Sequence, residues 1–287
     1  MIVDAHHHLW DLEQNHYPWL RAEPDPDAWV GDLQPIRRNY LVNEYLADAA
    51  GCGIVKSVHV EAAYDPNDSV GETHWLQAVA DRHGFPHAIV AAAHLEDPRL
   101  DTVLEAHLRA ANVRGIRQML DRDAGPALLE RSDWRRGLAR LADHDLSFDL
   151  QVNPDQLEAA ATLAQANEDV TFVLNHCGMP RERGPAAMEL WQRGLRRLAE
   201  APNVSAKVSG LGMFDHRWTA QSIRPFVETV LGAFGVERCM FGSNFPVDRL
   251  YGSYASLVAA MEELTSTLSV DERRRFFHDN AVRIYRL

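Results

Sequence analysis

Stretches with strand character alternate with stretches of helix character along almost the whole chain, and this alternation constrains the fold more than any other feature. Apolar, β-branched runs predict strands at residues 2–8, 54–60, 87–94, 113–120, 146–152, 170–176, 204–209 and 237–242. A helical stretch follows each of them, and a last helix is expected over residues 270–285. Strict alternation implies parallel strands joined by right-handed crossovers. Eight such units predict an α/β protein built as one (β/α)8 TIM barrel.

The length of the chain agrees with a single barrel. Its 287 residues compare with about 250 for a typical (β/α)8 barrel, and no linker or shift in composition divides them. We therefore expect one domain over residues 1–287. The segment 11–40 is rich in proline and tryptophan and long for a connection, which is usually a sign of function. It predicts a loop after the first strand that lies over the barrel mouth, with Trp19 or Trp29 either near the substrate or simply packed.

Composition narrows the classes of partner. The formal net charge is −12, whereas a nucleic-acid-binding protein needs a basic face. The sequence has no apolar run of about 18 residues that would span a bilayer, and no GxGxxG or phosphate-loop motif that would bind a nucleotide cofactor. Three separated cysteines fit buried thiols in a reducing compartment better than disulfides. The expectation is a cytoplasmic protein that acts on a small molecule, without nucleic acid, membrane or nucleotide.

A cluster of three histidines follows the first apolar residues, in the order Ile2-Val3-Asp4-Ala5-His6-His7-His8. Alternate residues of a strand share a face. The spacing therefore predicts that Asp4, His6 and His8 point one way, and that His6 and His8 form a pincer for a metal ion or a substrate oxygen. A remnant of an affinity tag or a solvated terminal turn is the alternative interpretation.

Further polar residues follow the other predicted strands, at the end where barrel active sites are built. They are His59, Glu61, His94, Arg117, Gln118, Asp149, Gln151, His176, Lys207, Ser209 and Asn244.

These residues belong to a series of motifs that spans the chain in order. The motifs include Asp4-Ala5-His6-His7-His8, Asn175-His176-Cys177-Gly178-Met179-Pro180 and Phe241-Gly242-Ser243-Asn244-Phe245-Pro246. In this respect the chain resembles the amidohydrolase superfamily, and within it the lactonase-type group that hydrolyses fuconolactone, rhamnonolactone and pyrone-dicarboxylate lactone. The resemblance implies a barrel that hydrolyses a small ester-like ring, and it suggests a homodimer. A metal-dependent decarboxylase of the same superfamily is the alternative, and a barrel that has lost catalysis is a third hypothesis.

The chain departs from the superfamily's metal-binding pattern at three strands. Strand four offers Arg117 and Gln118, strand five offers Asp149 and Gln151, and Asn244 replaces the usual aspartate of strand eight. Only His6, His8 and His176 remain as plain metal ligands. They could hold one divalent ion, such as zinc, with water as the fourth ligand. Because members of the lactonase group also work without metal, a metal-independent reaction is slightly favoured.

The resemblance also suggests roles for individual residues. In the family the aspartate at position 244 is the general base, and a carboxamide cannot take a proton. We therefore expect Asp248, or failing that a pincer histidine, to act as base while Asn244 positions the water. The expected catalytic set is His6, His8, His176, Asn244 and Asp248.

Five more residues are expected to bind substrate: His59, Arg117, Asp149, Gln151 and Lys207. Each has a structural alternative. Lys207 could pair with Asp149 inside the barrel, and Arg117 with Asp4 or Glu61. His59 could be a core histidine, and Asp149 and Gln151 could simply cap their strand.

Overall fold

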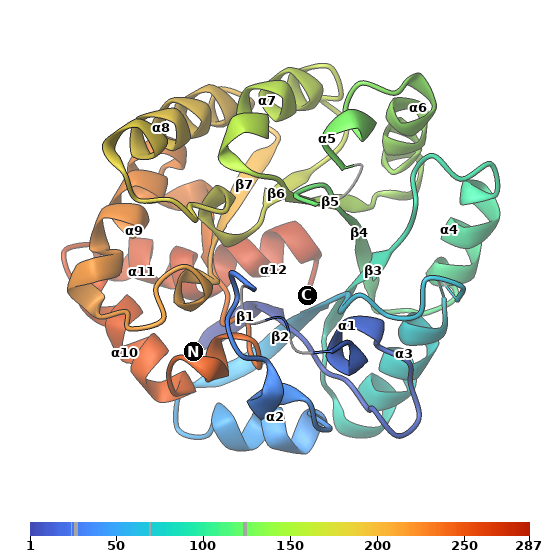
Figure 1. Ribbon diagram of the computed structural model, residues 1–287, viewed down its shortest axis with the longest axis horizontal. Coiled ribbons are helices and arrows are strands. Elements are labelled where there is room, and N and C mark those ends of the chain that lie inside the picture. The colour runs from blue at the N-terminus through green and yellow to red at the C-terminus, as the bar shows by residue number, and fades with distance from the viewer. Residues whose placement is uncertain (24, 26–27, 69, 123–124) are drawn as a thin grey trace.

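Eight parallel strands form one sheet whose order in space is their order in the chain (Figure 1). The computed structural model describes residues 1–23, 25, 28–68, 70–122 and 125–287. The strands are β1 (Ile2–His7), β2 (Ile54–Val60), β3 (Ala88–Ala92), β4 (Val113–Met119), β5 (Ser147–Gln151), β6 (Phe172–Leu174), β7 (Val204–Val208) and β8 (Cys239–Phe241). A bridge between His7 and Phe245 joins the segment after β8 to β1 and closes the ring. The predicted (β/α)8 barrel is confirmed.

Helices surround the ring of strands (Figure 1). They are α1 (Pro18–Arg21), α2 (Val42–Asp48), α3 (Gly71–His83), α4 (Leu100–Leu108), α5 (Gly125–Leu128), α6 (Ser132–Arg140), α7 (Leu157–Gln165), α8 (Pro185–Ala199), α9 (Ala220–Phe234), α10 (Tyr254–Leu264), α11 (Val270–Arg274) and α12 (Asn280–Tyr285). A wider helical turn at Arg275–Asp279 joins the last two. The predicted final helix over 270–285 is therefore present as one continuous helical stretch.

The hydrophobic core has two parts. The larger part lies between the strands and the surrounding helices. The smaller part fills the barrel with short strand side chains, among them Val3, Val60 and Val173, and α12 contributes Ile284 and Tyr285 to it. In Figure 1, α12 lies across the middle of the ring of strands. Because α12 closes one end of the barrel, a site can form only at the other end, where the polar residues that follow the strands lie.

The segment between β1 and α2 crosses the barrel, as expected for a loop over its mouth (Figure 1). Trp10 and Tyr40 pair through their backbones and bring the two ends of this loop together. In the described part of the chain, no helix is long and apolar enough to cross a bilayer.

Gly137 tests how tightly the outer core is packed. A methyl group on this buried glycine of α6 would lie 1.9 Å from the carbonyl oxygen of Leu95, which is backbone and cannot rotate away. We expect Gly137→Ala to lower the free energy of unfolding by about 1–3 kcal/mol, the usual cost of overpacking. The matched control is Gly232→Ala in α9, where nothing lies within 4 Å; it should be neutral or stabilising. Urea denaturation of both variants measures the difference, and equal midpoints would contradict the packing argument.

Candidate active site

A register irregularity in β1 determines which way the terminal histidines point. The pairing of β1 with β2 shifts between Asp4 and His7. Asp4 lies among Tyr45, Tyr254 and Ser243, and it accepts hydrogen bonds from their hydroxyl groups. His6, in contrast, faces Lys207 inside the barrel. The predicted shared face for Asp4, His6 and His8 is therefore wrong for Asp4, which is a structural residue joining β1 to the segment after β8.

The structure brings His6, His8 and His176 together. The ring centroids of His6 and His8 are 5.0 Å apart, and those of His6 and His176 are 4.4 Å apart. His8 Nδ1 lies 2.7 Å from the carbonyl oxygen of Val60, and His176 Nδ1 lies 3.0 Å from the Ser209 hydroxyl. Both bonds fix the orientation of their rings. The sequence-distant imidazoles therefore form one cluster, as the expected catalytic set requires.

All three rings are neutral at physiological pH. Burial, reinforced by the charge of Arg117, lowers the pKa of His8 to about 4. Burial and the nearby charges of Lys207 and Arg117 hold the pKa values of His6 and His176 well below the usual range. A neutral imidazole has one nitrogen that donates and one that accepts, so each ring offers either a donor or a base to a ligand.

A cavity of about 240 Å³ opens beside this cluster. Five of the predicted site residues line it: His8, Arg117, Gln151, His176 and Asn244. His6 does not line it and is fully buried against the rings of His8 and His176. The loop after β1 supplies Trp19, Trp29, Val30 and Leu33, and later loops supply Met179, Met213 and Val247. The expectation that this loop covers the barrel mouth is thus confirmed, and the cavity combines a polar floor with apolar walls.

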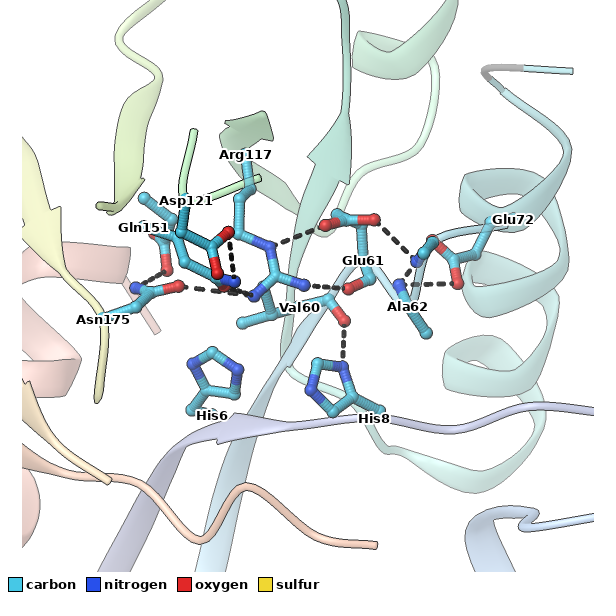
Figure 2. A network of polar contacts seen from close by, with 12 residues as sticks. His6, His8, Val60, Glu61, Ala62, Glu72, Arg117, Asp121, Gln151 and Asn175 are labelled. Carbon is cyan, nitrogen blue, oxygen red and sulfur yellow. Dashed lines mark hydrogen bonds and ion pairs between the residues drawn. The ribbon is translucent and has the colours of Figure 1, made fainter. Parts of the chain in front are cut away.

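Arg117 is held by several partners at once, as Figure 2 shows. Its Nε donates to Glu61 Oε1 at 2.7 Å, and Nη2 donates to the Glu61 carbonyl oxygen. Nη1 donates to Gln151 Oε1 at 2.9 Å, and Gln151 Nε2 donates to Asp121 Oδ1 at 3.0 Å. Asn175 also lies against Nη1. The structural pair of Arg117 with Glu61 is therefore real, yet the guanidinium still lines the cavity.

Sequence reasoning did not find Asp121 or Asn175, although both belong to this network. Asn175 directly precedes His176, and Asp121 follows β4 by two residues. Asn175 is the first residue of one of the motifs that carry the family resemblance, and this signal could have identified it. Asp121 carried no such signal, because an acidic residue in a loop is common.

Lys207 and Asp149 do not reach the cavity, which corrects their predicted role as substrate-binding residues. Lys207 Nζ lies 2.5 Å from Asp149 Oδ2, and both side chains are fully buried. Asp149 shares its strand face with Gln151 but precedes it by two residues, so it lies deeper in the barrel. The alternative that sequence left open, an internal ion pair, is the observed arrangement.

His59 does not have the substrate-binding position that was predicted for it. Its neighbours Val58 and Val60 fill the barrel interior. His59 points the other way, with Nε2 3.3 Å from the Leu9 carbonyl oxygen and its ring edge-on to that of His7. It does not line the cavity and is a buried packing residue.

Asp248 lies behind Asn244 rather than in the cavity. Asn244 Nδ2 donates to Asp248 Oδ1 at 2.9 Å, and the Asp248 carboxyl is buried. Burial raises the pKa of Asp248 to about 7, although the bond from Asn244 opposes this shift. Because the carboxyl does not line the cavity, this placement does not support Asp248 as the general base. Its contact with Asn244 instead fixes the orientation of the Asn244 amide, which lines the cavity.

The sequence matches the amidohydrolase family model over residues 3–287. The chain belongs to the amidohydrolase family. It is therefore a hydrolase of the amidohydrolase superfamily, as the motifs predicted.

Relatives of this amidohydrolase cover its full length. It is 45% identical to the uncharacterized protein y4mH of Sinorhizobium fredii, over 100% of this chain and 98% of that protein. It is 29% identical to an L-fucono-1,5-lactonase of Burkholderia multivorans, over 99% of this chain and 96% of the lactonase. A crystal structure of an amidohydrolase from B. multivorans with bound zinc superposes with a TM-score of 0.87 at 29% identity, covering 100% and 99% of the two chains.

The ligand set of this amidohydrolase does not fit a preformed metal site. Among the residues that the structure describes, no group of three or more histidine, cysteine, aspartate or glutamate side chains is arranged to hold an ion. His6 faces the ammonium group of Lys207 at 3.5 Å, which repels a cation. The carboxylates of Asp149 and Glu61 are already paired, with Lys207 and Arg117 respectively. The predicted ligands His6, His8 and His176 thus meet, but with the positive charge of Lys207 beside one of them.

Asp248 should make the stability of this amidohydrolase depend on pH. Its pKa is about 7 in the fold and close to 3.9 in the unfolded chain. The unfolded state therefore releases its proton first, and stability falls as pH rises from about 4 to 7. Asp248→Asn keeps an oxygen acceptor for Asn244 and removes this penalty. We expect the variant to be more stable than the wild type at pH 8, by up to about 4 kcal/mol, and equally stable near pH 4. Denaturant titrations at both pH values test this; a difference that is the same at both would contradict it.

Proposed function

We propose that this amidohydrolase is a lactonase, which opens a small lactone ring by attack of water on the ring ester. The observation that carries the proposal is His8, a buried imidazole that burial keeps neutral and that lines the cavity next to Asn244. The full-length relationship to L-fucono-1,5-lactonases supports the choice of a lactone over other hydrolysable bonds. The modest cavity, about 240 Å³, suits a monocyclic substrate.

His8 is the proposed general base. Its Nδ1 donates to the carbonyl oxygen of Val60, so the proton of the neutral ring is on Nδ1 and Nε2 keeps its lone pair. Burial keeps the ring unprotonated at neutral pH. The side chain of Asn244 favours the protonated form of His8, which is the form produced when the base takes a proton from water.

The remaining cavity residues serve the other steps. Water oxygen forms a bond to the lactone carbonyl carbon as His8 Nε2 takes a proton, and the carbonyl electrons move to oxygen. The charged guanidinium of Arg117 and the ring of His176 line the same cavity and stabilise this oxyanion. The oxyanion then collapses, the ring carbon–oxygen bond breaks, and the departing alkoxide takes the proton back from His8. The product is an open-chain hydroxy acid.

A panel of lactones tests the proposal. It should contain sugar-acid 1,5-lactones, including L-fucono-1,5-lactone, and lactones that carry a carboxylate. Acid release is followed with a pH indicator and compared with spontaneous hydrolysis. Hydrolysis of at least one class well above the rate with a His8→Asn variant supports the proposal. Rates equal to those of that variant across the whole panel would reject it.

We also expect this lactonase activity to be independent of added metal, since the ammonium group of Lys207 lies 3.5 Å from His6 Nδ1 and opposes a cation at the three histidines. Treatment with a chelator followed by dialysis should leave kcat unchanged, and elemental analysis of the purified protein should find well under one metal per chain. Loss of activity on chelation, restored by zinc, would show that a metal site assembles with substrate. Tight stoichiometric metal would instead favour the decarboxylase alternative.

A further inference from the structure

The buried ion pair of Lys207 and Asp149 has no part in the proposed reaction, yet it is strongly held. Asp149 accepts hydrogen bonds from three donors: Lys207 Nζ at 2.5 Å, Asn175 Nδ2 at 3.0 Å and the Tyr285 hydroxyl at 2.9 Å. These contacts fix the position of Lys207 Nζ inside the barrel, as one half of an ion pair whose two side chains are fully buried.

The same ammonium group faces His6. The distance from Lys207 Nζ to His6 Nδ1 is 3.5 Å, which is long for a hydrogen bond. An ammonium group offers only hydrogens. A proton on Nδ1 would therefore point at a positive charge, whereas a lone pair on Nδ1 is attracted to it. In the neutral ring the proton is then on Nε2.

The second ring nitrogen of His6, Nε2, is left without a hydrogen-bond partner in the described part of the chain, which is a reason to expect a ligand or a water molecule beside it. The atom is buried, and it has no hydrogen-bond partner among the described residues. A buried N–H group without an acceptor costs free energy, so such groups are rare unless a water molecule or a ligand completes them.

His8 has the opposite proton arrangement. Its Nδ1 faces a backbone carbonyl oxygen at 2.7 Å, which can only accept. The proton is therefore on Nδ1, and the lone pair is on Nε2. The rings of His6 and His8 lie edge to face with centroids 5.0 Å apart, and both project from β1 toward Arg117 in Figure 2. Two adjacent imidazoles thus offer one donor and one acceptor.

We propose that Lys207 is a positioning residue that holds His6 in the tautomer opposite to that of His8. The inference rests on the proposed function, in which His8 accepts the proton of the attacking water. The N–H of His6 then donates to an oxygen that enters beside His8, either the water itself or the substrate carbonyl. If His6 had the same tautomer as His8, both Nε2 atoms would be acceptors, and that oxygen would have no donor from β1.

The tautomers can be measured without any substrate. In protein labelled with ¹⁵N-histidine, long-range proton–nitrogen correlation spectra distinguish Nδ1–H from Nε2–H rings, and His6→Asn and His8→Asn variants assign the two patterns. We expect Nε2–H for His6 and Nδ1–H for His8. The same tautomer for both rings would overturn the proposal. Because this readout needs no turnover, it stands even if the lactone panel fails.

A charge-neutral double variant tests the role of Lys207. Lys207→Met together with Asp149→Asn removes both charges and avoids leaving one buried ion unpaired. We expect His6 to lose its Nε2–H preference and kcat to fall roughly 10- to 100-fold, as for other positioning residues, with little change in KM.

Tyr285→Phe is the control, because it removes one hydrogen bond to Asp149 and leaves Lys207 facing His6. It should change neither the tautomer of His6 nor kcat. An unchanged His6 tautomer in the double variant, or an equal loss of kcat in Tyr285→Phe, would overturn the assignment.

Discussion

His8→Asn is expected to lower kcat for lactone hydrolysis by about 10²- to 10⁴-fold, the usual contribution of a general base. The asparagine amide can still donate to the Val60 carbonyl oxygen from the position of the imidazole Nδ1. The variant therefore removes Nε2 and retains the hydrogen bond that anchors the side chain. Initial rates under saturating substrate measure kcat directly.

The neighbouring histidine gives a matched control. His7 stacks on Tyr45 with a centroid distance of 4.2 Å, and its Nε2 lies 2.9 Å from the Ser57 hydroxyl. It does not line the cavity, so His7→Asn should affect stability far more than kcat. Equal losses of kcat in His7→Asn and His8→Asn, with both proteins folded, would show that His8 is not the base.

Arg117→Met is expected to lower the free energy of unfolding by about 3–5 kcal/mol, because it leaves the carboxylate of Glu61 buried without its partner. Both side chains of this pair are only 4% exposed. Burial alone would raise the pKa of Glu61, and the charge of Arg117 reverses this so that the pKa is lowered overall. Without Arg117, Glu61 should become protonated more readily. The defect should therefore be larger at pH 8 than at pH 5.

Two further variants isolate the buried pair. Adding Glu61→Gln to Arg117→Met removes the unpaired charge and should restore part of the lost stability. Arg193→Met breaks an exposed pair with Glu158 and should cost only about 0–1 kcal/mol. Guanidinium denaturation compares all of these proteins. If Arg117→Met alone is no less stable than Arg193→Met, the pair of Arg117 and Glu61 contributes no net stability.

The fold was predictable because periodicity and alternation are local properties of the sequence. All eight strands lie within the predicted ranges, and the last helix has the predicted extent. The closure between β1 and the segment after β8 follows from strand count alone. The family resemblance added the expectation that His6, His8 and His176 would meet, and they do.

The site was only partly predictable, because strand periodicity gives the face of a residue but not its depth. Asp149 and Gln151 share a face, yet one lies in the barrel interior and the other lines the cavity. Periodicity also fails at an irregular strand: the register shift in β1 separates Asp4 from His6. No short-range pattern in the sequence indicates such a shift. The partner of Asp248 was likewise unpredictable, because its position depends on how a loop folds back.

The closure of the barrel has a consequence for synthesis. Strand β1 is made before the other seven strands and completes its pairing with Phe245, and α12, made after all eight strands, contributes Ile284 and Tyr285 to the barrel interior. A nascent chain therefore carries an unpaired edge at β1 until the segment after β8 has been made, and such edges promote aggregation. Stalled or truncated chains should consequently be strong clients of chaperones, whereas the released protein has no such exposed edge at β1.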